Sequence, residues 1–256
     1  IYTWIKGEDG EYTKYYTAVT VKLSTLQDKT IYVAEGKSID IGEISGENKG
    51  KIKYSKIDTN NVTVENNKVT GKKAGDTTII ATESNGGAQA KITIKIVKLT
   101  LEKTKEITTV GDNKKIQVSG INNGTISAKS NDETIAKVTV NGTELTVIPQ
   151  NVGNAKIMIT ENNAEANIEY EIQVVGITLA PNGGTYTMPT TGKATIRTKV
   201  KVENASKIEV AWTSAKLEWK TIENNSETIK NDCEKGTYYL YVKIDNEYLY
   251  QSQAFI

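Results

Sequence analysis

The chain has 256 residues, and 32 Lys and Arg nearly balance 31 Asp and Glu; the two signs are interspersed, which argues against nucleic acid as the main partner. It has no histidine and a single cysteine, Cys233, so we expect no enzyme, no catalytic residues, no metal site, no cofactor and no internal disulfide. Its apolar runs are far shorter than the roughly 18 residues of a membrane span, so we expect no span in this chain.

The first predicted element is a β-hairpin at residues 1–20. Its segment from Tyr2 to Lys6 aligns with Tyr239 to Lys243 at an offset of 239 − 2 = 237 residues. After one gap, Glu11 to Val19 aligns with Glu247 to Phe255 at an offset of 247 − 11 = 236. We therefore expect residues 1–20 to be the terminal hairpin of an incomplete domain whose earlier strands lie outside this chain. The alternative is that another subunit supplies the missing strands.

Residues 21–98 and 99–176 are predicted to be two copies of one domain. Val21-Lys22-Leu23-Ser24 recurs as Val97-Lys98-Leu99-Thr100 at an offset of 97 − 21 = 76, and Gly75-Asp76-Thr77-Thr78-Ile79 recurs as Gly153-Asn154-Ala155-Lys156-Ile157 at 153 − 75 = 78. Segments of period-2 alternation rich in Val, Ile and Thr, separated by turn residues, predict strands throughout. We find no convincing amphipathic helix, so the predicted fold is all-β.

The clearest hairpin is predicted between residues 138 and 147. Asn141-Gly142 stands between two alternating segments, and this dipeptide supplies the positive φ angles of a two-residue turn. We expect Asn141 and Gly142 to be its central residues.

Residues 177–256 have similar length but a different pattern. Trp212 ends an alternating segment in which a sandwich core needs one large ring. The junctions at residues 96–98 and 174–176 are short, so we expect them to restrict bending between neighbouring domains.

The two repeated parts resemble the bacterial Ig-like group 2 domain. The segment from Ser130 to Val138 is similar to the family's S-x-D-x-x-V-A-x-V, and the segment from Val69 to Thr82 is similar to V-T-G-x-x-x-G-x-x-x-I-x-A-T. The second part departs from the latter at Pro149, where the first part has Gly71. The resemblance implies tandem Ig-like β-sandwiches from a bacterial surface protein or a phage virion, with opening strands at 21–23 and 97–101. Residues 177–256 look like an Ig-like domain of a second type.

Four aromatic residues are the candidate contact residues: Tyr2, Trp4, Tyr239 and Tyr241. Alternation places them on the face of each terminal hairpin that also carries lysine, and we expect that face to point outward. Three interpretations stay open. The rings could pair across strands to support the sheet, contact a neighbouring domain or subunit, or stack on a ligand such as a sugar.

The function expected from these patterns is a non-enzymatic stalk or spacer of a bacterial cell-surface or secreted protein, placed outside the cell or on a virion. Its expected partners are neighbouring Ig-like domains or identical subunits. One alternative is a virion or filament subunit that assembles through its terminal hairpin. Another is an adhesin or carbohydrate-binding module that holds cell-wall glycan or a host surface.

Overall fold

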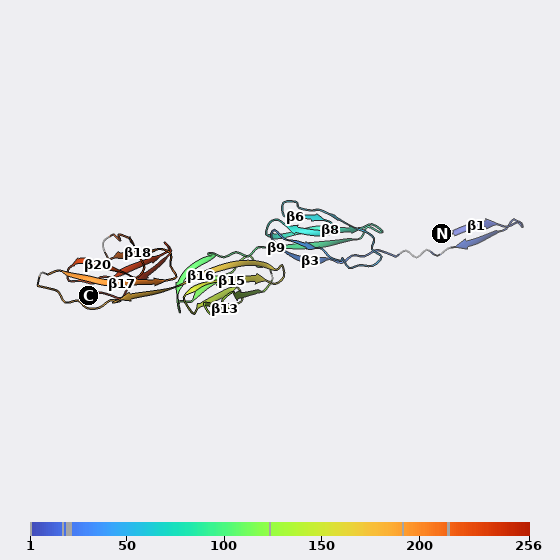
Figure 1. The fold of residues 1–256 in the computed structure, drawn as a ribbon. Coiled ribbons are helices and arrows are strands. Elements are labelled where there is room, and N and C mark those ends of the chain that lie inside the picture. Colours follow the sequence, from blue (N-terminus) through green and yellow to red (C-terminus); the bar gives the residue numbers. More distant parts are fainter. Residues whose placement is uncertain (1, 17, 19–21, 123, 191, 214–215) are drawn as a thin grey trace. The chain divides into compact units, whose positions relative to one another are not determined.

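The computed structural model describes residues 2–16, 18, 22–122, 124–190, 192–213 and 216–256 (Figure 1). All regular structure in these residues is β-strand, which confirms the prediction of an all-β fold of tandem Ig-like β-sandwiches. The chain divides into two compact units, residues 1–97 and 98–256. In the described part of the chain, no helix has the length and apolar character that a membrane crossing requires.

Unit 1 begins with a hairpin. Strands β1 (Tyr2–Lys6) and β2 (Tyr12–Tyr16) pair antiparallel in a sheet of their own, so the predicted pairing is confirmed. Lys6 lies opposite Tyr12, and Lys243 lies opposite Leu249 in the last hairpin. The spacing is the same in both, 12 − 6 = 249 − 243 = 6 residues, so both strands correspond at the single offset of 237. The predicted gap is wrong because loop length sets the register, and matching residue identities do not.

The first sandwich, also in unit 1, has a four-stranded and a three-stranded sheet. Alternating residues of the two longest strands, including Ile79, Ile92 and Ile94, point into one core and are fully buried. The larger sheet has the order β3 (Lys29–Ala34), β9 (Gln89–Val97), β8 (Gly75–Glu83), β5 (Ile52–Ser55), and the smaller one β4 (Ser38–Asp40), β7 (Lys68–Gly71), β6 (Val62–Glu65).

The second sandwich, which opens unit 2, repeats this topology. Its first strand again pairs parallel with its last, as β3 does with β9. One sheet has the order β10 (Lys105–Thr109), β16 (Ala166–Ala180), β15 (Gly153–Glu161), β12 (Ile126–Ser130), and the other β11 (Lys114–Gln117), β14 (Glu144–Pro149), β13 (Ala136–Asn141). The repeat found in the sequence is therefore a repeat of strand order.

The third sandwich shares a strand with the second. After pairing with β15, β16 continues and pairs with β17, so it crosses the boundary expected between residues 176 and 177. Phe255 is fully buried in the third core, and Trp212 packs against that core half-buried. The remaining strands are β17 (Ala194–Glu203), β18 (Ile208–Trp212), β19 (Lys220–Ile222), β20 (Ser226–Cys233), β21 (Leu240–Ile244) and β22 (Tyr248–Gln251).

The expected opening strands are not formed in the described residues 22–23 and 98–101, and Val21 lies outside the described residues. Residues 22–28 have no regular structure, and in 98–104 Thr100 makes only an isolated bridge to Ser119. Leu23 is 78% exposed, whereas Leu99 is buried. A few backbone bonds hold these segments instead, such as Thr25 N–H to Glu47 O (3.0 Å) and the two bonds that Thr100 exchanges with Ser119 (3.0 Å each).

The predicted Asn-Gly turn is displaced by one residue. Asn141 pairs with Glu144, which makes Gly142 and Thr143 the central residues, and Gly142 has a φ of 61°. The observed register sets Val140 opposite Leu145. A turn centred on Asn141-Gly142 would instead set Val140 opposite polar Thr143, so side-chain pairing decides the register.

Cys233 is a free, buried cysteine at the end of β20. Only 2% of its surface is exposed, and burial raises the pKa of its thiol. We expect Ellman's reagent to react with the folded chain at pH 8 at least tenfold more slowly than with the chain in guanidinium chloride, because the thiolate is the reacting species. Equal rates in the two conditions would contradict the buried position.

Candidate functional site

The N-terminal hairpin carries aromatic and lysine side chains on one face, which we call the hairpin face (Tyr2, Trp4, Lys6, Tyr12, Lys14 and Tyr16). The register sets Tyr2 opposite Tyr16, Trp4 opposite Lys14, and Lys6 opposite Tyr12. Lys14 Nζ lies 3.9 Å from the centroid of the Tyr2 ring and 5.6 Å from that of the Trp4 ring. Lys6 Nζ lies 5.7 Å from the centroid of the Tyr12 ring.

Both faces of this hairpin are exposed. On the hairpin face, Trp4 is 59% and Tyr16 76% exposed, and on the opposite face Ile5 is 54% exposed. Exposed cation–π pairs contribute only about 0.5–1 kcal/mol each, and an isolated two-stranded hairpin is marginally stable in water. The hairpin therefore presents more apolar surface than its own contacts cover.

Tyr239 and Tyr241 lie in the third sandwich and are half-buried. Tyr241 is on the outer face of β21, opposite Ala211. The backbone N–H of Tyr239 donates to Thr213 Oγ1 (2.7 Å), and its carbonyl accepts from the Thr213 N–H (2.9 Å). The four candidate residues thus fall in two different units. Tyr2 and Trp4 are exposed in unit 1, and Tyr239 and Tyr241 are half-buried in unit 2.

A charged cluster of Glu209, Lys207 and Lys243 lies beside Tyr241 and was not predicted from the sequence. Glu209 Oε2 lies 3.0 Å from Lys243 Nζ and 3.2 Å from Lys207 Nζ. Lys243, and then Lys207, lower the pKa of the Glu209 carboxyl from its ordinary value. Lys243 Nζ also lies 4.5 Å from the centroid of the Trp219 ring. The signal available in the sequence was the position of Glu209 between the apolar Ile208 and Val210.

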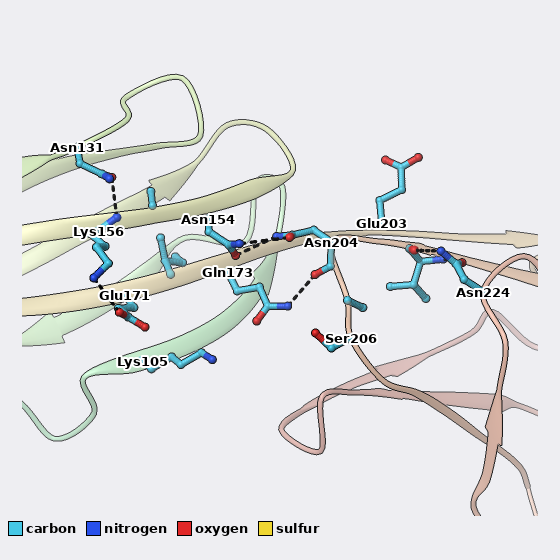
Figure 2. Close-up of a pocket in the computed structure, with 14 residues that line it drawn as sticks. Lys105, Asn131, Asn154, Lys156, Glu171, Gln173, Glu203, Asn204, Ser206 and Asn224 are labelled. Carbon is cyan, nitrogen blue, oxygen red and sulfur yellow. Dashed lines mark hydrogen bonds and ion pairs between the residues drawn. The ribbon is translucent and has the colours of Figure 1, made fainter.

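A polar hollow of about 690 Å³ lies where the two sandwiches of unit 2 meet. Figure 2 shows Asn154 and Gln173 pointing toward Asn204 across this junction. Gln173 Nε2 donates to the carbonyl of Asn204 (2.7 Å) and to Asp245 Oδ2 (2.8 Å). Asn204 Nδ2 donates to Asn154 Oδ1 (3.1 Å) and to the carbonyl of Val174 (3.0 Å). We call Asn154, Gln173, Asn204 and Asp245 the polar joint.

The backbone explains why asparagine stands at 204. Asn204 follows the last residue of β17 and has a φ of 60°, a left-handed conformation that asparagine adopts more readily than most residues. Asp245 completes the joint from the loop after β21, where its Oδ1 accepts from the backbone N–H of Ser206 (2.9 Å) and of Lys207 (2.6 Å). The carboxamides of Asn154 and Asn204 therefore bond to each other, and that of Gln173 bonds to a backbone carbonyl and a carboxylate.

Lys156, at the edge of the hollow, is held in two ion pairs. Lys156 Nζ lies 2.6 Å from Glu169 Oε1 and 3.2 Å from Glu171 Oε1, and these carboxylates raise the pKa of the Lys156 amine. A lysine held protonated in this way is unsuited to act as a general base. Among the residues that the structure describes, no group of three or more His, Cys, Asp or Glu is placed to hold a metal ion.

Comparison with known proteins gives fold neighbours only. No protein-family model matches the chain, and no curated protein matches it. Domains 4 and 5 of the S-layer protein SbsC are 14% identical with a TM-score of 0.28, over 48% of this chain and 75% of that one. The I9–I11 tandem of titin is 13% identical with a TM-score of 0.27, over 90% and 97%. Extracellular domains 3–5 of Drosophila OTK are 11% identical with a TM-score of 0.34, over 89% and 94%.

Proposed function

We propose that the chain is a non-enzymatic spacer, a stiff segment of a stalk built from tandem Ig-like sandwiches. The observation that carries the proposal is the junction between the second and third sandwiches, where strand β16 and one apolar core continue from one sandwich into the next. The resemblance of residues 21–176 to bacterial Ig-like group 2 domains favours a bacterial cell-surface or secreted parent protein. Its partners would then be the neighbouring Ig-like domains.

Strand β16 is the main support for stiffness. Val174 pairs with Gly153 of the second sandwich, and two residues later Gly176 pairs with Glu203 of the third. No free linker residue separates the two ladders. Bending at this point would break backbone hydrogen bonds, each worth about 1 kcal/mol net.

The apolar core supports the same conclusion. Ile107 and Val175, from strands that pair within the second sandwich, belong to the buried cluster of the third, together with Leu179 and Val202. Ile107 is 4% exposed and Val175 is fully buried. Hinging would expose these side chains at a cost of about 25 cal/mol per Å² of apolar surface.

Double electron–electron resonance on the full chain tests the stiffness of the junction between the second and third sandwiches. Spin labels at Lys137→Cys and Lys220→Cys, with Cys233→Ala, report across the joint from two exposed positions. We expect one narrow distance distribution. A broad distribution would show a hinge and would remove the support for a spacer.

The polar joint is expected to narrow that distribution. Asn204→Gly keeps the left-handed backbone but deletes the bonds of the side chain to Asn154 and Val174, so we expect a broader distribution with the sandwiches still folded. Asn225→Gly is the matched control, because Asn225 also has a positive φ, 64°, and lies outside the joint. Equal widths in the two variants would show that the joint does not limit bending.

A further inference from the structure

The two hairpins of this chain correspond residue for residue, but only one of them is covered. At the offset of 237, Ile5 corresponds to Val242 and Tyr15 to Ser252. Ile5 is 54% and Tyr15 55% exposed, whereas Val242 is fully buried and Ser252 is 4% exposed. The N-terminal hairpin therefore exposes the face that its counterpart buries in a core.

The counterpart also identifies which edge of the hairpin lacks a partner. The outer sheet of the third sandwich has the order β19-β18-β21-β22, so β22 is an edge strand and β21 pairs with β18. By correspondence β2 is a natural edge and β1 is an inner strand. Among the described residues, β1 pairs with β2 alone.

We propose that the free edge of β1 docks a strand with the chemistry of β18, supplied by another module of the type seen at residues 177–256. The strand adds antiparallel to β1 by main-chain hydrogen bonds, and its side chains set the register. An acid lies opposite Lys6 and a small residue opposite Trp4, as Glu209 lies opposite Lys243 and Ala211 opposite Tyr241.

Charge favours this occupant. Neither β1 nor β2 contains an acidic residue, and the hairpin face carries Lys6 and Lys14. In the covered hairpin, Glu209 lies 3.0 Å from Lys243, the counterpart of Lys6. A strand with glutamate at this position gives Lys6 the same partner, and opposite charges directly across a ladder are favourable.

Size favours it as well. Ala211 is only 2% exposed although it lies on the outer face, opposite Tyr241. Trp4 takes the place of Tyr241 in the N-terminal hairpin, so the docked strand needs a comparably small residue there. A second copy of β1 would bring lysines and large rings to this edge and no acid, which makes a hairpin-to-hairpin dimer the poorer fit.

The test uses the ¹⁵N-labelled full chain and a synthetic peptide of residues 206–213, SKIEVAWT. We expect amide shifts in Tyr2–Lys6 that saturate on titration and are larger than those in β2. The control peptide carries Glu209→Lys and should bind about fivefold more weakly, because a favourable cross-strand pair becomes a repulsive one. Lys6→Glu in the chain should reverse this preference between the two peptides.

Three outcomes would overturn the proposal, and each is distinguishable from failure of the spacer role. The two peptides could bind equally, which removes the acid-to-Lys6 pairing. The shifts could fall in the third sandwich, which means that the peptide competes with β18 at its own position. The chain alone could show concentration-dependent shifts in Tyr2–Lys6, which identifies a second copy as the occupant.

Discussion

Replacing Phe255 by alanine is expected to lower the free energy of unfolding of the third sandwich by about 3–5 kcal/mol, the usual cost of removing a buried ring. Phe255 is fully buried. Its ring centroid lies 5.3 Å from that of Trp212, edge-on at 66°, and 6.1 Å from that of Tyr186. It is the only phenylalanine in the chain, and the truncation leaves a cavity between these rings.

The backbone of Phe255 makes collapse of that cavity difficult. Its carbonyl accepts from the N–H of Tyr238 (2.8 Å), and its N–H donates to the carbonyl of Tyr238 (2.9 Å). Because both bonds fix the segment, the surrounding side chains can relax only in part. The large end of the expected range follows from this restraint.

Urea unfolding followed by tryptophan fluorescence measures the effect, since Trp212 lies beside the lost ring. Leu249→Ala is the control, because Leu249 is in β22 but 55% exposed, and surface truncations usually change stability by no more than about 0.5 kcal/mol. A loss below about 1 kcal/mol for Phe255→Ala, or equal losses in both variants, would contradict the assignment of Phe255 to the core.

Strand positions and faces could be predicted from the sequence because alternation is a local signal. In β17 the pattern of Ala194 to Val202 places Ile196, Val200 and Val202 inward, and these side chains are buried. The hairpin that carries Tyr2 was predicted from a different signal, its alignment with the segment that carries Tyr241. Alternation placed Trp212 correctly beside the third core, but it could not show that Phe255, outside any strand, is the fully buried ring.

Cross-strand and cross-sandwich partners could not be predicted, because they depend on register and on distant segments. Tyr12, Lys14 and Tyr16 join the hairpin face because β2 pairs with β1 in a register that the length of the loop between them sets. Polar joint residues such as Gln173, Asn204 and Asp245 lie on three separate elements, and in an asparagine-rich sequence nothing marks Asn204 until its backbone conformation is known. Local patterns specify each strand, and tertiary contacts select the site.

Replacing Glu83 by glutamine is expected to loosen the β8–β9 hairpin of the first sandwich. Glu83 is 2% exposed. Its carboxylate accepts bonds from the Ser24 hydroxyl (2.5 Å) and from the backbone N–H groups of Asn85 (2.6 Å), Gly86 (2.6 Å) and Gly50 (3.0 Å). Glutamine carries one amide nitrogen, which cannot accept, so some of these N–H groups lose their partner.

The pH dependence of this effect follows from the same contacts. The Ser24 hydroxyl, with the backbone N–H groups, holds the pKa of the Glu83 carboxyl below its ordinary value although burial acts the other way. A carboxyl whose pKa is lower in the folded than in the unfolded chain stabilises the fold to its full extent only above the unfolded pKa, which is about 4.3 for glutamate. This contribution to the free energy of unfolding falls as the pH drops below that value. The difference between the parent chain and Glu83→Gln should therefore narrow between pH 7 and pH 3.

Hydrogen exchange read by mass spectrometry separates this hairpin from the rest of the chain. At pH 7 we expect exchange in residues 75–97 to rise about tenfold in Glu83→Gln, because charge-assisted bonds are lost, while residues 153–175 of the repeated sandwich keep their rates. Glu65→Gln, at an exposed position in β6, should change neither segment. Unchanged exchange in 75–97 would mean that solvent replaces the carboxylate at no cost, so that Glu83 does not hold the hairpin loop in place.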